Sequence, residues 1–316
     1  MDVSVVVVNW NTKDLLRCCL NSIYEQAGNV SYEIIVVDNA STDGSAEMVR
    51  SEFPAVILTV EQNNRGYAAA INDAIRIARG RYVLVLNSDI ISCDKAIEKT
   101  VGYADRHPQA AVVGCQVRDN PDKIQMTCFQ FPSLLNLFLR STGLARIFKY
   151  NRFFGREDMR WWQRDSERQV DVVSGMFMLV RSEAIRQVGP MDEDYFLYCE
   201  ETDWCYRFAK AGWKMLFWPG AMILHPGGGG HSSKTKELQL EVQMKKSTLL
   251  FFKKHYGTIQ YILARLLMAF YSGCRYLAVI VRLLGKSITR QNVAPDLKEK
   301  QKQWVAFKYC AFGLEP

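Results

Sequence analysis

The chain has 316 residues, of which 48% are hydrophobic and 23% are charged. This composition is typical of a globular protein with ample material for a core, organised as one large domain or two. The nine cysteines are scattered without the spacing of a zinc site, and the N-terminus lacks the features of a signal peptide. Together these features exclude a disulfide scaffold and predict reduced thiols in a cytosolic setting.

The net charge of +7 is distributed unevenly along the chain. Residues 231–316 contain 15 Lys/Arg against 5 Asp/Glu, whereas residues 1–230 contain 25 against 28. A basic tail can contact nucleic acid or an anionic membrane surface. Solubility alone explains an excess of charge that has no pattern, so we expect no nucleic-acid partner.

The first 120 residues alternate between buried-type strands and amphipathic helices. Strands are predicted at 3–8, 33–37, 55–60, 81–86 and 111–117. Helices are predicted at 13–26, with Thr12 as the cap, and at 45–53, 66–78 and 94–106. Short links between alternating strands and helices predict an α/β fold with a doubly wound, mostly parallel sheet.

The rest of the chain is less regular. Periodicity is weak over residues 119–170, and a strand over 172–180 is broken by Ser174-Gly175. A helix at 200–210 and strands at 215–218 and 222–225 follow, then four glycines at 227–230 and helices at 236–255 and 258–284 with a polar end. We therefore expect a sheet domain over 1–233 and a basic, helical C-terminal extension over 234–316.

The apolar segment 259–284 contains Arg265, Arg275 and Arg282, so it is too charged for a simple membrane-spanning helix. On a helix these arginines and Lys286 fall on one side, opposite a stripe of apolar residues. This pattern is typical of a helix lying in a membrane interface. Packing on the core of the sheet domain or on another subunit is the alternative.

Polar residues follow three of the predicted strands, at Asn9, at Asp38 and at Asn87-Ser88-Asp89. Ligands of such sheets bind beyond the carboxyl ends of the strands. Asp38 could accept a hydrogen bond from a pyrimidine or a ribose hydroxyl, or cap its own turn.

The segment 63–70 opens a helix with small residues, where a backbone can approach closely and negative charge is favoured. Asn64, Arg65 and Gly66 lie in this segment, and Arg65 could contact a phosphate. A tightly packed helix without a ligand has the same sequence pattern.

Asp89 is a candidate ligand for Mg²⁺ or Mn²⁺, which prefer one or two carboxylates together with diphosphate oxygens. It could instead cap the next helix. His225 could complete the metal shell. The glycines that follow it, with His231, Ser232 and Ser233, could form a lid over a diphosphate or a plain linker.

Glu200, Glu201 and Asp203 lie together at the start of a predicted helix. A carboxylate there could remove the proton of an acceptor hydroxyl. Acids also favour helix N-termini, and for Asp203 we favour an ion pair with Arg207 four residues later.

Taken together, these residues resemble glycosyltransferase family 2, which has the GT-A fold, over residues 3 to about 233. The resemblance is carried by SVVVVNWN (4–11), VVDNASTDGS (36–45), NNRGYAAAIN (63–72), VLNSD (85–89), SGMFMLVRSEAI (174–185) and FLYCEETDWCYR (196–207). The first two segments are most similar to the bacterial rhamnosyltransferase branch, which uses dTDP-L-rhamnose to build surface polysaccharides such as O-antigen.

The resemblance implies an inverting sugar transfer from a dTDP- or UDP-sugar to a glycan or a lipid-linked acceptor. It implies nucleotide contacts at Asp38, a metal at Asp89 in the place of the family's DxD motif, and a base at Glu200-Glu201. Asn87 replaces the first aspartate of DxD, and Glu201 stands where the family usually has aspartate, which shifts its carboxylate by roughly 1.5 Å. We expect Asn9, Asn64, Arg65, Gly66, Asn87 and Ser88 to contact the donor.

These expectations place the enzyme in the cytoplasm, on the inner face of the cytoplasmic membrane, and leave a homodimer open. A non-catalytic nucleotide-sugar binder or scaffold is the main alternative, with Asn87 and Glu201 as marks of lost activity. A nucleotidyltransferase is a second alternative, but the first loop, at Asn9–Lys13, lacks the glycine that such enzymes need.

Overall fold

The computed structural model describes residues 1–120, 122–226, 237–288 and 294–314. The chain divides into two compact units. The first contains the described residues of 1–131 and 158–232, and the second those of 132–157 and 233–316. The expected glycine lid and the boundary at residue 233 lie outside the described residues. All nine cysteines are free thiols.

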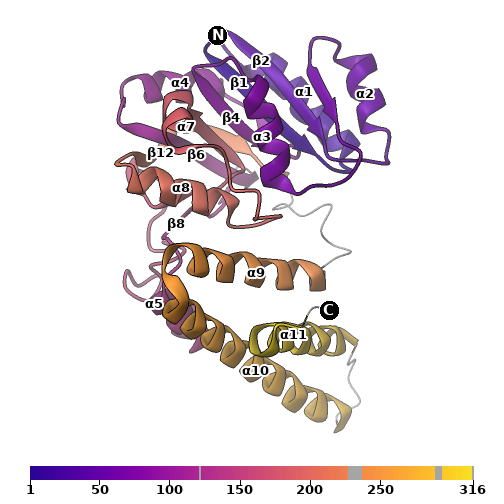
Figure 1. Ribbon diagram of the computed structural model, residues 1–316, viewed down its shortest axis with the longest axis vertical. Coiled ribbons are helices and arrows are strands. Elements are labelled where there is room, and N and C mark those ends of the chain that lie inside the picture. Colours follow the sequence, from indigo (N-terminus) through magenta and orange to yellow (C-terminus); the bar gives the residue numbers. More distant parts are fainter. Residues whose placement is uncertain (121, 227–236, 289–293, 315–316) are drawn as a thin grey trace. The chain divides into compact units, whose positions relative to one another are not determined.

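The first unit is built on one large sheet with the strand order β3-β2-β1-β4-β11-β6-β12-β5 (Figure 1). Its strands are β1 (Val3–Asn9), β2 (Tyr32–Asp38), β3 (Ile57–Val60), β4 (Tyr82–Asn87), β5 (Ile91–Ser92), β6 (Ala110–Asn120), β11 (Phe177–Arg181) and β12 (Lys214–Leu224). Short strands β7 (Lys123–Ile124) and β9 (Arg168–Val170) pair with β6 and β12, and β8 (Cys128–Phe129) pairs with β10 (Val172–Val173).

The sheet is mostly parallel, as predicted. Strands β1 to β4 run parallel to one another, and β12 is parallel to β6. Strand β11 is antiparallel to both of its neighbours, β4 and β6. The register pairs Asn9 with Asp38 and Val8 with Asn87, so the carboxyl ends of β2, β1 and β4 meet at one edge.

Helices cover both faces of this sheet. They are α1 (Lys13–Gln26), α2 (Ser45–Glu52), α3 (Tyr67–Ile77), α4 (Ala96–Asp105), α7 (Ser182–Val188) and α8 (Glu200–Lys210). In β1, Val5 and Val7 pack into a core with α1, α2 and α4, whereas Val6 and Val8 pack into a core with α3 and α8. This two-sided burial explains why the strand is a continuous run of valines.

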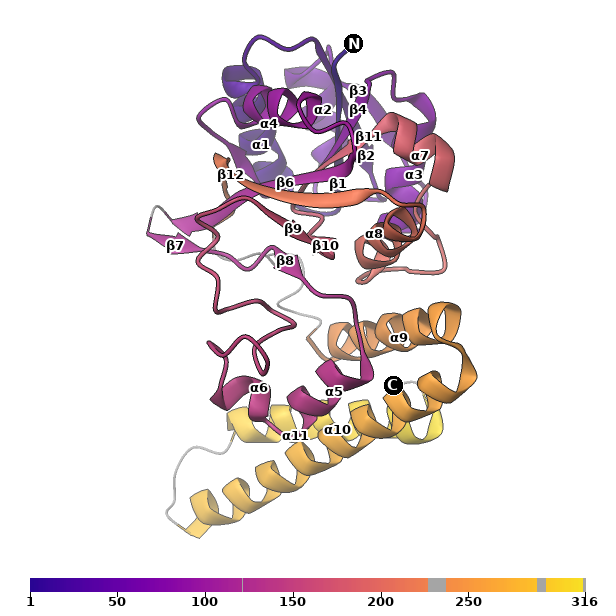
Figure 2. The same cartoon turned by 90° about the vertical axis from the view of Figure 1, so that its left-hand side faces the viewer.

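The second unit consists of α5 (Leu134–Ser141), α6 (Leu144–Ile147), α9 (Glu237–His255), α10 (Gly257–Ile288) and α11 (Ala294–Phe312). Its core includes Leu137 of α5, Phe252 of α9, Met268 of α10 and Cys310 of α11. Helix α5 lies against α10, where the Ser141 hydroxyl donates to the Leu267 carbonyl oxygen at 3.3 Å (Figure 2). The C-terminal helical extension therefore also includes an earlier segment of the chain, 132–157.

Three local predictions differ from the structure. The two strands expected at 215–218 and 222–225 are one strand, β12, whose register shifts between Trp218 and Met222, around Pro219 and Gly220. The polar end of the chain contains helix α11, whose apolar residues are concentrated in its second half and so show no clear helical period. Thr12 makes no capping hydrogen bond to α1, because its side chain faces the strand ends instead.

Candidate functional site

The ends of β4, β1 and β2 are joined by a chain of side-chain hydrogen bonds. The Thr12 hydroxyl lies 2.8 Å from the Ser88 hydroxyl and donates to Asn9 Oδ1 at 2.6 Å. Asn9 Nδ2 in turn donates to Asp38 Oδ1 at 2.8 Å. Asn9 and Asp38 are buried, so their oxygens are fixed in position. The structure thus brings together Asn9, Asp38 and Ser88, as the sequence predicts.

Asp38 is also held by the turn that follows its strand. Its Oδ2 accepts from the backbone N–H of Ser41 at 3.0 Å, and the Ser41 hydroxyl accepts from Asn9 Nδ2 at 3.0 Å. The turn-capping role and a ligand-binding role are therefore compatible, since each carboxylate oxygen keeps a second lone pair.

The loop before α3 packs tightly against the segment that leads into α8. Asn64 Oδ1 accepts from the backbone N–H of Gly66 at 3.0 Å and from Asn39 Nδ2 at 3.1 Å. Gly66 has a φ of +92°, and a Cβ atom there would lie 2.5 Å from the Phe196 carbonyl oxygen. The Tyr67 N–H donates to that same oxygen at 2.8 Å. Only glycine fits this position, which ties the Asn64–Gly66 loop to the acidic segment.

Arg65 was expected to contact a phosphate, but in this structure it pairs with acidic side chains. Its Nε lies 3.2 Å from Glu61 Oε2, and its guanidinium also forms an ion pair with Asp73. The side chain is about half-exposed. In this conformation its charge is already compensated by two carboxylates.

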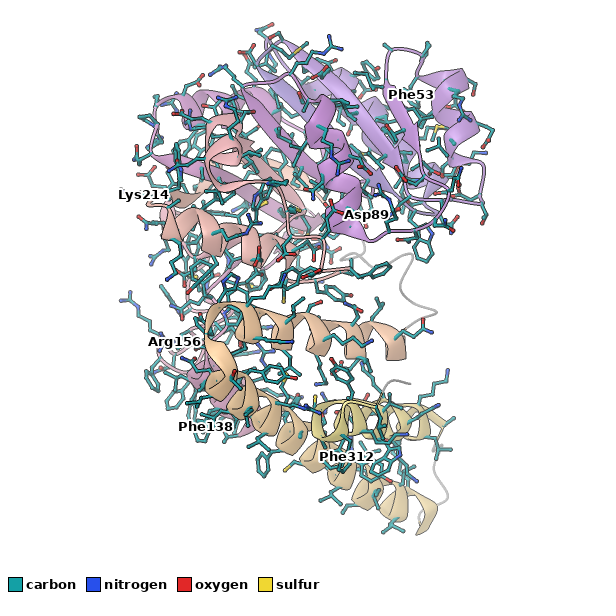
Figure 3. The ribbon with its side chains drawn as sticks, viewed as in Figure 1. Phe53, Asp89, Phe138, Arg156, Lys214 and Phe312 are labelled. Atoms are coloured by element: carbon teal, nitrogen blue, oxygen red, sulfur yellow. The ribbon has the colours of Figure 1, made fainter. Side chains whose placement is uncertain are left out.

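Asp89 and His225 form the candidate metal site. Figure 3 shows Asp89 at the edge of the sheet where the parallel strands end. His225 Nε2 lies 3.2 Å from Asp89 Oδ2, and both side chains are largely buried. Nε2 nevertheless has no hydrogen-bond partner in this arrangement. A buried, unpartnered nitrogen beside a carboxylate fits a divalent cation.

Within the described ranges, no group of three or more His, Cys, Asp or Glu side chains could enclose a metal ion. Asp89 and His225 would therefore supply two ligands, leaving the remaining positions to water and a substrate. An incomplete protein shell is common for Mg²⁺ and Mn²⁺ sites that act on phosphates.

Glu200 and Glu201 are the first two residues of α8, so the helix begins where the sequence predicts it. Burial raises the pKa of the Glu200 carboxyl well above its ordinary range, and the neighbouring charge of Glu201 raises it further. Burial also raises the pKa of Glu201, which is partly exposed. Asp203 forms the predicted ion pair with Arg207, at 2.7 Å, and so is engaged elsewhere.

The segment before α8 is strained. Tyr198 and Cys199 both have positive φ, at 67° and 66°. A side chain in this left-handed region costs of order 1–3 kcal/mol, and such residues cluster at functional sites. Here the strained pair sets the direction in which α8 begins and thereby places Glu200 and Glu201.

Tyr67 connects the metal site with the acids, and sequence reasoning missed it. Its hydroxyl donates to Asn87 Oδ1 at 3.2 Å. Burial raises the pKa of Tyr67 well above its ordinary value, and the negative charges of Glu200, Glu201 and Asp89 add to the effect. The negative charges of all three carboxylates therefore act on the hydroxyl of this partly buried tyrosine. The sequence signal that could have pointed to Tyr67 is its position directly after Gly66, at the start of a helix.

Comparison with known proteins decides between the enzyme and binding-protein interpretations. A family model described as glycosyltransferase like family 2 matches residues 1–247. The chain belongs to this family. It is a glycosyltransferase, since its characterised relatives are sugar-transferring enzymes.

Two relatives are rhamnosyltransferases by name. The N-acetylglucosaminyl-diphospho-decaprenol L-rhamnosyltransferase of Mycobacterium tuberculosis is 30% identical over 241 residues, which cover 71% of this chain and 76% of that protein. The rhamnosyltransferase WbbL of Escherichia coli is 25% identical over 232 residues, which cover 71% of this chain and 83% of that protein.

A solved structure supports the GT-A fold. The mannosyltransferase PcManGT of Pyrobaculum calidifontis, in complex with GDP-Man and Mn²⁺, superposes with a TM-score of 0.56 and 18% identity. The match covers 98% of this chain and 85% of that one. The glycosyltransferase thus has the fold that its sequence motifs imply.

Proposed function

We propose that this glycosyltransferase transfers L-rhamnose from dTDP-L-rhamnose to a polyprenyl-diphosphate-linked sugar, with inversion at the anomeric carbon. The identities of the donor and the acceptor are inferred from one similarity. Over more than two thirds of its length, the chain is similar to a rhamnosyltransferase that is named for a lipid-diphosphate-linked acceptor. The carboxylates around Tyr67 support a single displacement, because a metal-binding acid and an acid pair lie in one neighbourhood.

Asp89 and His225 would hold the Mg²⁺ or Mn²⁺ ion. When bound, the ion neutralises the negative charge of the departing nucleoside diphosphate. The strand-end carboxylate of Asp38 offers fixed hydrogen-bond acceptors to the nucleotide. Asn87 then orients the Tyr67 hydroxyl.

Glu201 acts as the base in this proposal. Glu201 is partly exposed as a residue whereas Glu200 is buried, which favours Glu201 as the acid nearer to an acceptor. Burial and the adjacent charge both oppose the ionisation of Glu200 and raise its pKa. A neutral Glu200 leaves Glu201 free to ionise and to remove the acceptor proton.

A panel of nucleotide sugars tests the donor. The purified full-length chain is incubated with Mn²⁺, polyprenyl-diphosphate N-acetylglucosamine and each sugar of the panel in turn, and released nucleoside diphosphate is measured. We expect dTDP-L-rhamnose to give the fastest acceptor-dependent release. Faster release from a UDP- or GDP-sugar would overturn the rhamnosyl assignment while leaving the glycosyltransferase in place.

We also propose that the second unit rests on the anionic inner surface of the cytoplasmic membrane. In α10, residues 257–286 are long and apolar enough to cross a membrane, with a mean hydropathy of 1.4 and only 22% of the most apolar window buried. Length and composition do not distinguish a spanning helix from one that lies in the interface.

The orientation of α10 favours the interface. Its cationic side faces α11, where Arg265 Nε donates to the Cys310 carbonyl oxygen at 2.6 Å and Lys286 Nζ lies 2.6 Å from Asp296 Oδ2. Arg275 also forms an ion pair with Glu299 of α11. The exposed apolar residues of α10 are Ile259, Ile262, Leu263, Leu266, Phe270, Leu277, Val281 and Leu284. A soluble helix normally has the opposite arrangement, with its apolar face turned inward.

The segment 132–157 of the same unit also combines exposed apolar residues with basic residues. Its exposed large apolar residues are Leu135, Phe138, Ile147, Phe148, Tyr150 and Phe153. The same segment contains Arg140, Arg146, Lys149, Arg152 and Arg156, against one acid, Glu157. Aromatic and basic side chains together are typical of proteins that bind anionic lipid surfaces. Phe138 and Arg156 are labelled in Figure 3.

Vesicle flotation tests the membrane proposal. We expect the full-length chain to float with vesicles that contain phosphatidylglycerol, and Leu266→Glu combined with Phe270→Glu to weaken binding at least about tenfold, since each buried side chain contributes about 1.5–3 kcal/mol. Ile77→Glu is the matched control, because Ile77 is similarly exposed but lies in the first unit. Undiminished flotation of the double variant, or resistance of membrane-bound protein to alkaline carbonate, would contradict an interfacial helix.

A further inference from the structure

Gln125 makes two hydrogen bonds to the same histidine. It directly follows β7, and its backbone N–H donates to the Val117 carbonyl oxygen at 2.8 Å. Its side-chain Nε2 donates to the His225 carbonyl oxygen at 2.9 Å, and its Oε1 lies 2.8 Å from His225 Nδ1. The Gln125 side chain therefore forms hydrogen bonds to both the main chain and the imidazole of His225.

This pairing determines which imidazole nitrogen carries the proton. A carbonyl oxygen can only accept, so the NH₂ group of Gln125 must face the His225 carbonyl. The amide oxygen of Gln125 then faces Nδ1 and requires a proton there. A neutral imidazole with its proton on Nδ1 has its lone pair on Nε2. That nitrogen is the buried, unpartnered atom beside Asp89.

We propose that Gln125 is a positioning residue that holds His225 in the Nδ1–H form and aims its Nε2 lone pair at a cation bound by Asp89. The inference rests on the metal site of the proposed function. Without Gln125, the tautomer with its proton on Nε2 is the more stable one, because Nε2 can then donate a hydrogen bond to the Asp89 carboxylate. That form has no lone pair to offer a cation and occupies the oxygen that the cation needs.

Outer hydrogen-bond partners of metal-binding histidines typically change metal affinity 10- to 100-fold. Gln125→Leu removes both hydrogen bonds, whereas Gln125→Glu keeps an acceptor for the Nδ1 proton. We therefore expect Gln125→Leu to weaken Mn²⁺ binding by about 10- to 100-fold and Gln125→Glu to stay within a few-fold of the wild type. Gln109→Leu is the matched control, since Gln109 is exposed.

The experiment combines two measurements on the full-length chain. Mn²⁺ affinity is measured from the electron paramagnetic resonance signal of free Mn²⁺ in the presence of dTDP, with circular dichroism to verify folding. The His225 tautomer is measured without metal by long-range ¹H–¹⁵N NMR, which is practicable because the chain has four histidines. A role in folding alone would not alter the tautomer.

The proposal predicts the Nδ1–H form in the wild type and in Gln125→Glu, and a shift to Nε2–H in Gln125→Leu. An Nε2–H form in the wild type would overturn it, as would a folded Gln125→Leu variant with unchanged tautomer and Mn²⁺ affinity. Absence of Mn²⁺ binding by the wild type would instead overturn the metal role within the proposed function, and the NMR result would still test the effect of Gln125 on His225.

Discussion

Replacing Asp89 by alanine is expected to reduce kcat/KM for sugar transfer by at least about 100-fold. The reason is the loss of the carboxylate that would hold the cation against the leaving diphosphate, a contribution of several kcal/mol, and each 1.36 kcal/mol corresponds to a tenfold change in rate. His225 alone is a weak site for a hard cation such as Mg²⁺. The measurement is release of dTDP from dTDP-L-rhamnose, together with Mn²⁺ binding by the same preparation.

Asp94→Ala is the matched control for this variant. Asp94 lies five residues from Asp89, but its side chain is exposed and pairs with Lys99 at 2.5 Å. Its loss should leave transfer within about twofold, since surface ion pairs contribute about 0–1 kcal/mol. Asp89→Ala with unchanged activity, together with activity that survives a chelator, would exclude the metal role.

Glu201→Gln is expected to lower transfer by about 100- to 10,000-fold while leaving donor affinity unchanged, because general-base catalysis contributes on that scale. Glutamine has the size of glutamate but cannot take the acceptor proton. The comparison is between kcat for transfer and the Kd of dTDP-L-rhamnose measured by calorimetry. Retained transfer in Glu201→Gln with loss in Glu200→Gln would move the base to Glu200.

Glu200→Gln is the control for this pair, and it should preserve transfer and stabilise the fold at neutral pH. The raised pKa of Glu200 means that the folded chain binds its proton more tightly than the unfolded chain does. From the ordinary glutamate pKa of about 4.3 up to the raised folded value, the folded state therefore loses stability as pH rises. Glutamine does not titrate, so the variant should have a higher Tm than the wild type at pH 7 and no such advantage below about pH 4.

The pH dependence of sugar transfer follows from the burial of the Glu201 carboxyl. Because the pKa of Glu201 is raised, wild-type transfer should decline on the acid side at a pH above the ordinary range of a glutamate. An acid limb at or below about pH 4.3 would contradict the environment described for this carboxyl.

The sequence predicted those parts of the site that depend on strand ends and local spacing. Asn9, Asp38 and Asn87 could be placed together because each ends a strand of a parallel sheet, and carboxyl ends of neighbouring parallel strands share an edge. The Asp203–Arg207 pair followed from the four-residue spacing of a helix. Both inferences need only the period of an element and the direction of its strands.

Other residues depend on contacts that no local pattern encodes. Gln125 meets His225 across 100 residues of chain, and the stretch around it has weak periodicity. Thr12 looked like a helix cap, because threonine before a helix usually is one, but a neighbouring asparagine competes for its hydroxyl. The role of segment 132–157 was also hidden, since its helices α5 and α6 are short and α5 packs on α10, which comes much later in the chain.

The stereochemistry of the product tests the central claim most directly. The full-length enzyme is supplied with dTDP-L-rhamnose, Mn²⁺ and polyprenyl-diphosphate N-acetylglucosamine, and the anomeric configuration of the isolated disaccharide product is determined by NMR. A single displacement assisted by Glu201 predicts a rhamnosyl linkage whose configuration is opposite to that of the donor. Retention of the donor's configuration would contradict the mechanism, and donor hydrolysis without a disaccharide would contradict the acceptor.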